Sequence, residues 1–478
     1  MGDAAPAAGR DRLAVLALLL AVAAAYATSF AGTFQFDDWN VIVRDPRVQS
    51  LPAWWRSMPG IRPLLKLSYA LNRASGLGLP GFHAVNLALH AGNALLAFDL
   101  LRAVGRRADP GSPALRGAAL LGALLFALHP AQTEAVTYLS GRSAALAATF
   151  SLGSLVCWLA GRERSRPWLA LAASPLLFAA ALGAKETAVV LPLALLLLEA
   201  VDRRRPFSWA AALRASWVHW LVLAAGLSAF LAAPTYRRMV AESLDLRPPI
   251  ENLLTHVRAT AYLAGQVVRL GGLDADPLLP AVRGLAPAVA LEGLALLLVL
   301  GAGLLLLRRR PSVAFGILWF LLWLAPAGWW LPRPEPANDR QLYLSLLGPA
   351  WLAGRWLAPR AAAGGPWRLF ALALVAALGA ATAHRNLVYA DEVRFWQDVV
   401  RKSPANPRAH NNLGYALAGA CRAEEAEVAF LRALELDPER HRAAVNLALL
   451  RQGAPLGPEQ AGRCPPAGAG PSAGEPGR

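Results

Sequence analysis

The sequence has 478 residues, of which 56% are apolar and only 16% are charged, and this balance excludes an ordinary soluble multidomain protein. Its formal net charge of +16 comes almost entirely from arginine, because Lys66, Lys185 and Lys402 are the only lysines. The arginines lie in short clusters between apolar runs, as the positive-inside rule describes, so the charge does not indicate nucleic-acid binding. The chain is predicted to be a polytopic membrane protein.

Long apolar runs predict the membrane spans, because a bilayer core about 30 Å thick needs about 20 apolar residues per helix. Eleven runs qualify, near residues 12–31, 83–103, 114–129, 143–160, 168–184, 187–201, 216–234, 285–307, 312–330, 341–358 and 367–385. The first has the position of a signal peptide, but it lacks a clear small-residue cleavage site and further runs follow it. With the arginine clusters in the cytoplasm, the N-terminus lies inside and the C-terminus outside.

One segment does not fit this count. Residues 251–270, ENLLTHVRATAYLAGQVVRL, have helical periodicity, but His256, Arg258 and Arg269 interrupt it. A span here would place the arginine cluster at 308–310 outside, so we expect a helix that lies along the outer face or dips into it.

The outer face is expected to carry the function. It collects the first outer loop at 31–82, the loop at 235–284 and everything after about residue 386. Nearly all acids that lie close to a membrane boundary and outside a basic cluster fall on this side. A membrane protein with its unusual polar residues on one face is expected to work there.

The run at 83–103 carries a polar helical face. His83 is followed by Asn86, His90 and Asn93 at three, seven and ten residues, within one side of a helix. Hydrogen bonds between helices are the ordinary explanation for such residues. Two histidines two turns apart without a carboxylate do not form a familiar ligand set, and the three cysteines lack zinc spacing, so no metal site is predicted.

Two adjacent acids, Asp37 and Asp38, follow the first run in GTFQFDDWNVIVRDP, residues 32–46. Such a pair before an apolar residue usually forms a turn or a helix N-cap. A functional interpretation gains from RPLLKLSYALNR at 62–73 and NDRQLYL at 338–344 on the same face, because their cations could clamp an anionic headgroup beside a carboxylate.

Two further motifs allow both interpretations. His129 and Glu134 lie in HPAQTEAVTYLSGR, a pattern that is ordinarily a helix stop followed by a capping turn. Lys185 and Glu186 lie in a tight turn between two spans, where an interfacial ion pair is the ordinary explanation.

The chain changes character after the last span. In residues 386–452, six positions match the spacing of a tetratricopeptide repeat of about 34 residues: Leu413, Gly414, Ala426, Phe430, Ala433 and Pro438. One full repeat with partial neighbours is short of the roughly three repeats that stand alone, so we expect the region to pack on the membrane domain or a partner. The Gly-, Pro- and Ala-rich tail at 453–478 is predicted to be disordered.

These features together resemble the transmembrane and tetratricopeptide repeat-containing (TMTC-type) protein O-mannosyltransferases of the GT-C superfamily. The resembling segments are FQFDDWNVIVRDPRV, RPLLKLSYALNR, GFHAVNLALHAGNALL, LLFALHPAQTEAVTYLSGRSAALA, KETAVVLPLALLLLE and NDRQLYLSLLGPA. The resemblance implies an all-α fold, with a GT-C-type transmembrane bundle of about 11 spans at 1–385 and a short tetratricopeptide-repeat domain at 386–452.

The resemblance also implies a polyprenyl-phosphate sugar donor, typically dolichyl-phosphate mannose, and transfer to a protein serine or threonine hydroxyl at the outer face. It gives the role of base to Asp37 and a supporting role to Asp38. A carboxylate within hydrogen-bond reach can take the proton of a hydroxyl as the anomeric carbon is attacked. A second carboxylate beside it raises the apparent pKa of the pair. Direct displacement predicts inversion at the sugar.

The leaving group would be a lipid phosphate, whose developing charge Arg340, Arg142 or Lys185 would neutralise. The full set of predicted substrate-binding residues is Arg62, His83, Asn86, His90, His129, Glu134, Arg142, Lys185, Glu186, Arg340 and Tyr343. No metal and no other cofactor is expected. The predicted partners are the polyprenyl-phosphate sugar, membrane lipids and an acceptor protein held by the repeats.

Several alternatives stay open. The repeat region is much shorter than the arrays associated with this family, which leaves the acceptor open. The arginine-, alanine- and glycine-rich composition suggests a bacterium, with an undecaprenyl-type carrier in the inner membrane in place of dolichol in the endoplasmic reticulum. The main alternative function is a non-catalytic membrane scaffold for envelope assembly. A polysaccharide ligase or lipid-A-type sugar transferase would keep the chemistry and change the acceptor.

Overall fold

The structure is a computed structural model that describes residues 4–58, 60–163, 166–329, 331–457 and 460. These residues form helices and turns, and no strand occurs among them. The chain divides into two compact units. Unit 1 comprises residues 1–273 and 279–387, and unit 2 comprises residues 274–278 and 388–478.

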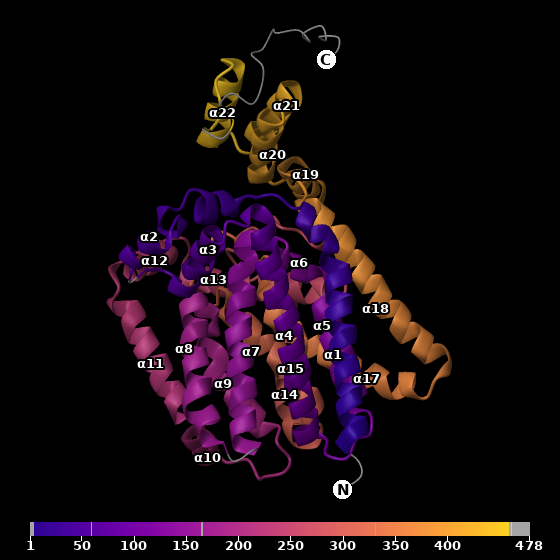
Figure 1. The fold of residues 1–478 in the computed structure, drawn as a ribbon. Coiled ribbons are helices and arrows are strands. Elements are labelled where there is room, and N and C mark those ends of the chain that lie inside the picture. Colours follow the sequence, from indigo (N-terminus) through magenta and orange to yellow (C-terminus); the bar gives the residue numbers. More distant parts are fainter. Residues whose placement is uncertain (1–3, 59, 164–165, 330, 458–459, 461–478) are drawn as a thin grey trace. The chain divides into compact units, whose positions relative to one another are not determined.

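Eighteen α-helices build the described part of unit 1 (Figure 1). They are α1 (Ala4–Tyr26), α2 (Leu51–Arg56), α3 (Pro63–Ala74), α4 (Gly78–Ala108), α5 (Leu115–Leu128), α6 (Thr133–Val136), α7 (Arg142–Glu163), α8 (Ser174–Ala184), α9 (Leu191–Ala200), α10 (Trp209–Ala215), α11 (Trp217–Ala232), α12 (Pro234–Leu244), α13 (Pro249–Gln266), α14 (Pro287–Arg309), α15 (Pro311–Leu324), α16 (Leu342–Ser345), α17 (Leu347–Ala362) and α18 (Gly365–Asn386).

Five helical segments among the described residues are long and apolar enough to cross a membrane: Asp11–Ala31, Gly78–Ala108, Leu139–Glu163, Pro287–Arg309 and Gly365–Tyr389. Two bent pairs, Leu115–Leu128 with Pro130–Val136 and α10 with α11, raise the number to seven if each pair is one span. The eleven predicted spans are therefore not confirmed. The apolar runs are interrupted: α9, for example, has only 10 residues and is about 15 Å long, half of a bilayer core.

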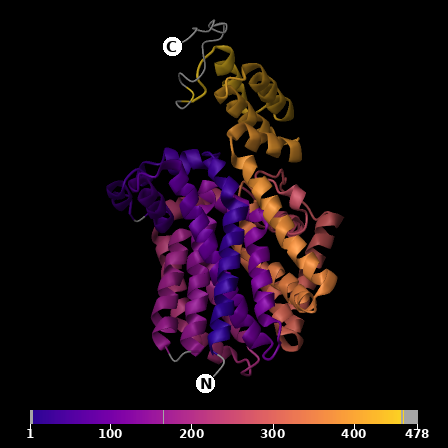
Figure 2. The same cartoon turned by 45° about the vertical axis from the view of Figure 1, so that its right-hand side comes forward.

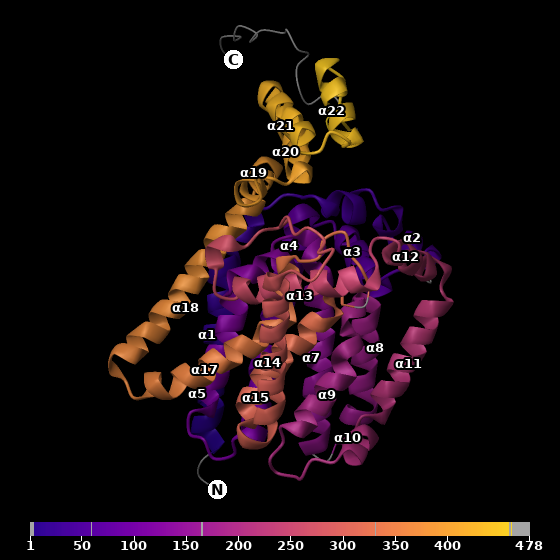
Figure 3. The same cartoon turned by 180° about the vertical axis from the view of Figure 1, so that it is seen from behind.

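The long helices of unit 1 run side by side between two ends (Figures 1 and 2). The N-terminal end holds the start of α1, the ends of α4 and α7, and α10. The loop end holds α2, α3, α6 and α12. Figure 3 shows α13, α14 and α15 on the other side of the bundle.

Small residues allow the helices in the centre of unit 1 to approach closely. A methyl group at Gly354 of α17 would overlap the backbone oxygen of Ala118 on α5, and one at Gly348 would overlap the backbone oxygen of Gly316 on α15. Close backbone approach through small residues is the usual way in which helices associate in membranes. The resulting rigid bundle carries the loops at its two ends.

The described part of unit 2 contains four helices, α19 (Glu392–Lys402), α20 (Pro407–Gly419), α21 (Ala423–Leu436) and α22 (His441–Arg451). Leu417, Phe430 and Leu447 form its small core, and Gly414 lies against the ring of Phe430. A side chain at residue 414 would collide with that ring, which explains why a glycine stands there. The predicted disordered tail at 453–478 lies outside the described residues, apart from 453–457 and 460.

A short segment from the α13–α14 connection, Asp274–Leu278, folds as part of unit 2. The carboxylate of Asp274 accepts a hydrogen bond of 2.7 Å from the Ser403 hydroxyl, and Asp276 pairs with Arg408. Both aspartates are almost fully buried. Asn406, which caps the start of α20, also donates its side-chain amide to the Asp276 backbone oxygen at 3.1 Å. Unit 2 is thus built from two separate stretches of the chain.

Candidate active site at the loop end

The two adjacent acids of the first loop have opposite environments. Asp38 is fully buried, and its carboxylate accepts backbone hydrogen bonds from Ser140 at 2.6 Å and from Gln35 at 3.0 Å. Burial raises the pKa of Asp38 from 3.8 to about 7, against the opposing effect of these two hydrogen bonds. Asp38 therefore ties the loop to the start of α7 rather than facing a substrate.

Asp37 points outward, with 39% of its side chain exposed. Its backbone N–H donates to the hydroxyl of Tyr138 at 3.0 Å, and its carboxylate oxygen lies 3.9 Å from the Arg340 guanidinium. The preceding Phe36 has φ of 40°, a left-handed conformation that costs a non-glycine residue about 1–2 kcal/mol. This turn directs the Asp37 carboxylate outward while Asp38 remains in the interior.

Arg340 connects this carboxylate to a second one. Its Nε lies 3.7 Å from Glu134, its backbone N–H donates to Glu134 at 2.9 Å, and its guanidinium lies 5.9 Å from the centre of the Tyr138 ring. Burial disfavours the charge of Arg340, but Glu134, Tyr138 and Asp37 outweigh it and raise the pKa of Arg340 above its ordinary value. The structure thus brings Asp37, Glu134 and Arg340 together at the loop end.

Three further cations lie close enough to influence one another. Arg62 binds Glu186, with 2.8 Å between Nη2 and Oε2. Burial, with nearby Arg340, Arg62 and Arg333, lowers the pKa of Lys185 well below its usual value. Burial, with Arg62 and Arg340, lowers the pKa of Arg333 to about 10. Within the described residues neither Lys185 nor Arg333 forms an ion pair, so an anion bound between them would relieve their repulsion.

The polar face of α4 lies beneath this group and holds the loops in place. His83 is 3.0 Å from the Gly32 backbone oxygen, just before the loop of the two aspartates. The Asn86 side-chain amide donates to the Val136 backbone oxygen at 2.9 Å. Both side chains are almost fully buried, so their contacts are with the chain itself, as interhelical hydrogen bonding requires.

His90 and Tyr343 belong to a second set of buried contacts. His90 Nδ1 lies 2.8 Å from the Tyr343 hydroxyl and its Nε2 lies 2.9 Å from the Ala127 backbone oxygen. Asn93 donates to the same hydroxyl at 2.9 Å. This network joins α4 to α5 and α16, and the structure does not bring it to Asp37.

Arg142 also lies in the scaffold. It is fully buried, its Nε donates to Asn86 at 2.6 Å and its Nη2 donates to the Phe82 backbone oxygen at 3.0 Å. Its guanidinium lies over the rings of Tyr69 and Phe82, at 4.8 and 5.3 Å. These contacts indicate a structural role, in contrast to the predicted contact with a phosphate.

His129 caps the turn after α5. Its Nδ1 accepts from the Ala131 N–H at 3.2 Å, and its Nε2 lies 3.0 Å from the Val267 backbone oxygen. A neutral imidazole that accepts at one nitrogen and donates at the other fits these two contacts. The His129 ring therefore ties the break after α5 to the end of α13.

Two residues of this site were not singled out from the sequence. Tyr138 lies inside the HPAQTEAVTYLSGR block, where nothing distinguished it from a packed aromatic residue. Arg333 stands in LPRPEPANDRQLY, between two prolines. An arginine on the face that the positive-inside rule keeps poor in arginine is the signal that could have found Arg333.

The fold and the distribution of charge define an integral membrane protein of all-α class. Comparison with known proteins is more specific. The chain is 33% identical to the human protein O-mannosyl-transferase TMTC4 over 153 residues, 27% of this chain and 21% of that protein. It is 38% identical to Tmtc1 of Drosophila melanogaster over 135 residues, 27% of this chain and 14% of that protein.

A third relative, protein O-mannosyl-transferase F38B6.6 of Caenorhabditis elegans, is 31% identical over 157 residues, 29% of this chain and 22% of that protein. No family model matches the chain. The matches confirm the predicted resemblance to the TMTC-type protein O-mannosyltransferases. The matched parts cover less than a quarter of the length of these three relatives.

Proposed function

We propose that this chain is a membrane glycosyltransferase that moves a sugar, with mannose as first candidate, from a polyprenyl phosphate to a serine or threonine hydroxyl of a protein at the extracytoplasmic face. Relatives are named protein O-mannosyl-transferases. The observation that carries the proposal is the half-exposed Asp37 carboxylate beside Arg340, which in turn interacts electrostatically with Lys185 and Arg333, two groups without an ion pair among the described residues. A base beside a group of cations is what such a transfer requires.

In the proposed reaction, Asp37 accepts the proton of the acceptor hydroxyl as its oxygen forms a bond to the anomeric carbon of the sugar. The bond from that carbon to the phosphate oxygen breaks, and the lipid phosphate leaves with the electron pair. Attack from the face opposite the phosphate inverts the configuration at the anomeric carbon. Arg340 lies 3.9 Å from Asp37 and provides a cation beside the proposed base.

The leaving phosphate gains negative charge, and the cations at the loop end are its proposed partners. Lys185 is the first candidate because it is buried and has no ion pair among the described residues. Arg333 is the second, and Arg62 presents its guanidinium while bound to Glu186. Cations that are already oriented in a partly dry site stabilise such a charge more than they would in water.

Asp38 is proposed to act as a positioning residue for Asp37. Its two backbone hydrogen bonds fix the turn that directs Asp37 outward. Its burial leaves Asp37 as the exposed carboxylate of the pair for the acceptor.

The finer architecture belongs to the same proposal. Unit 1 would be a GT-C-type bundle in which shorter apolar helices such as Leu169–Ala184 and Pro311–Leu324 complete about eleven crossings, with its arginine-rich N-terminal end in the cytoplasm. Helices α19–α22 would be of tetratricopeptide type and hold the acceptor. The carrier is undecaprenyl-type in a bacterial inner membrane, or dolichol in the endoplasmic reticulum. A reporter fused near Pro466 tests this orientation, and activity in the cytoplasm would contradict it.

A non-catalytic scaffold would need its outer polar groups only as caps and helix contacts. The α4 residues fit that description. The buried Lys185, which forms no ion pair among the described residues, does not, because its burial destabilises a fold that gains nothing from it. A ligase for polysaccharide or lipid A would use the same proposed site with another acceptor.

The direct test is to incubate the purified full chain with a panel of polyprenyl-phosphate sugars and to identify modified proteins by mass spectrometry. The proposal predicts a hexose on serine or threonine of co-purified proteins with one lipid-linked sugar. Transfer only to glycans or lipids would contradict a protein acceptor and leave the proposed donor. The absence of transfer from every donor tested would favour the scaffold.

A further inference from the structure

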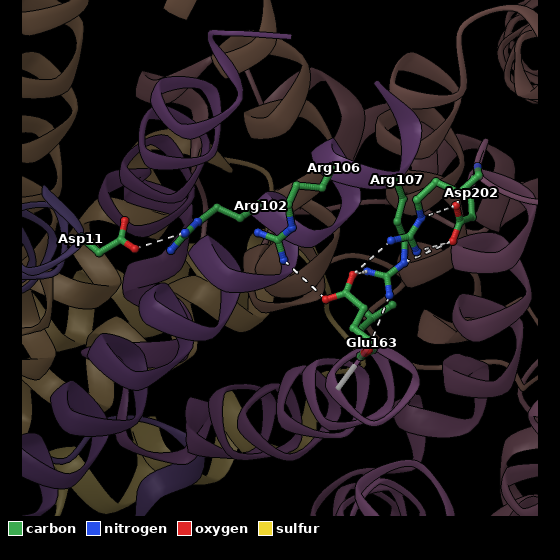
Figure 4. A network of polar contacts seen from close by, with 8 residues as sticks. Asp11, Arg102, Arg106, Arg107, Glu163 and Asp202 are labelled. Atoms are coloured by element: carbon green, nitrogen blue, oxygen red, sulfur yellow. Dashed lines mark hydrogen bonds and ion pairs between the residues drawn. The ribbon is translucent and has the colours of Figure 1, made fainter. Parts of the chain in front are cut away.

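The N-terminal end of unit 1 contains a network of ion pairs far from the residues discussed above. Arg107, at the end of α4, is 3% exposed and lies 3.0 Å from Glu163 and 3.4 Å from Asp202 (Figure 4). Arg204 lies 2.6 Å from Asp202 and 3.4 Å from Glu163, and Arg106 lies 3.7 Å from Glu163. These contacts join the ends of α4 and α7 to the chain that follows α9.

This network encloses a pocket of about 260 Å³. The lining residues are Arg107, Arg162, Glu163, Asp202, Arg204 and Arg205. Four arginines thus face two carboxylates, which leaves an excess of two positive charges in the lining. Among the described residues Arg205 forms no ion pair, and Arg204 is 40% exposed, so guanidinium groups remain accessible at the rim. The volume and the charge suit a phosphate group.

Aromatic residues place this pocket at the edge of the bilayer. Phe207 and Trp209, which follow the arginines directly in the chain, are 41% and 65% exposed, and their ring centres are 5.0 Å apart. Trp217, at the start of α11, is 52% exposed. Exposed tryptophans on a membrane protein lie at the level of the lipid headgroups. We therefore expect the pocket at the depth of lipid phosphates.

We propose that this arginine pocket binds the phosphate of an anionic phospholipid headgroup. Arg204 and Arg205 at the rim would donate to the phosphate oxygens, while Arg107 stays paired with Glu163 and Asp202. Basic pockets between transmembrane helices bind anionic lipid headgroups by the same chemistry. The flanking Phe207 and Trp209 favour a lipid over a soluble anion, because they bring acyl chains next to the rim. The inference does not depend on the proposed sugar transfer.

The experiment uses the full chain purified in detergent and supplied with phosphatidylglycerol, with net-neutral phosphatidylcholine, or with millimolar inorganic phosphate. Lipid retention is measured by native mass spectrometry, and thermal unfolding is followed in parallel. The pocket variant is Arg204→Gln with Arg205→Gln. The matched control is Arg309→Gln with Arg310→Gln, which removes the same charge near the end of α14, outside the pocket lining.

The proposal predicts that the wild type retains phosphatidylglycerol in preference to phosphatidylcholine, and that the pocket variant binds it about tenfold more weakly, while the control variant behaves like the wild type. Equal weakening in both variants would show a general charge effect and contradict the pocket. Inorganic phosphate that raises the unfolding temperature as much as phosphatidylglycerol does would contradict a lipid ligand. Equal retention of both lipids would overturn the proposal as well.

Discussion

The two ends of unit 1 both gather cations, but they pair them differently. At the N-terminal end the buried Arg107 lies between two carboxylates, Glu163 and Asp202. At the loop end the buried Lys185 and its neighbour Arg333 have no ion pair among the described residues. An uncompensated buried charge costs several kcal/mol, whereas a paired one holds elements together. We infer that the first end fastens helices and that the second receives an anion.

The largest expected effect comes from Lys185→Met. If Lys185 binds the leaving phosphate, its loss should lower kcat for transfer from the lipid-linked sugar by about 10²–10³-fold, the range for one donor to a developing anion. The same variant should unfold at an equal or higher temperature, because it removes a buried amino group that has no ion pair among the described residues. Lys66→Met is the matched control, because Lys66 forms an ion pair with Asp45, at 3.8 Å, whereas Lys185 forms none among the described residues. Similar activity losses in both variants would contradict this role.

The second prediction concerns Asp38 and pH. Burial raises the pKa of Asp38 from 3.8 to about 7, so between these values the folded protein holds a proton that the unfolded chain has released. The free energy of unfolding should therefore fall as pH rises through this window, by up to about 4 kcal/mol. Asp38→Asn, which does not titrate, should lack this component. Unfolding of both proteins in detergent from pH 4 to pH 8 checks it, and parallel curves would contradict it.

The third prediction tests the N-terminal end. Arg107→Met leaves Glu163 and Asp202 with less compensation, and it should lower the free energy of unfolding by about 3 kcal/mol. The activity per folded molecule should not change, because the residue is far from Asp37. Denaturant unfolding of Arg107→Met and Lys185→Met should give changes in the free energy of unfolding of opposite sign, if the two ends of unit 1 pair their cations as described. If Arg107→Met is as stable as the wild type, the inference that this end fastens helices is contradicted.

The smallest effect is expected for Tyr138→Phe. This change removes the hydroxyl that accepts the Asp37 N–H at 3.0 Å, a hydrogen bond worth about 1 kcal/mol. The expected result is a fall in kcat of about fivefold, with little change in KM for the lipid donor, because the turn that directs Asp37 loosens. Tyr343→Phe, which affects the buried contacts to His90 and Asn93, should lower stability instead. If Tyr138→Phe lowers stability and Tyr343→Phe lowers kcat, the role of Tyr138 at the site is contradicted.

Several features of the fold could be predicted from hydropathy and charge. The all-helical class follows from the long apolar runs, and so do the long helices α4, α7 and α14, which are continuous and apolar enough to span. The number of spans could not be predicted in this way. The runs near 114–129 and 187–201 end or begin at breaks beside Pro130 and Lys185, so an apolar segment of the expected length does not become one straight helix.

Residues of the candidate site could be predicted only where a short sequence motif identifies them. The aspartate pair and the position of Arg340 could be named because each lies in a recognisable motif. The sequence could not show that Arg142 is part of the scaffold while Arg333 belongs to the site, because both are arginines beside the same predicted face. Tertiary packing over Tyr69 and Phe82 buries the first, and the approach of a distant loop to Arg62 and Lys185 places the second.

Asp37 is the proposed base of the sugar transfer. The most direct measurement compares transfer from a polyprenyl-phosphate sugar by the wild type, by Asp37→Asn and by Asp245→Asn, an exposed aspartate after α12. If Asp37 is the base, Asp37→Asn should lose about 10²–10⁴-fold in activity, with unchanged unfolding temperature and donor binding, and the control should lose none. Full activity of Asp37→Asn in the same preparation would contradict it.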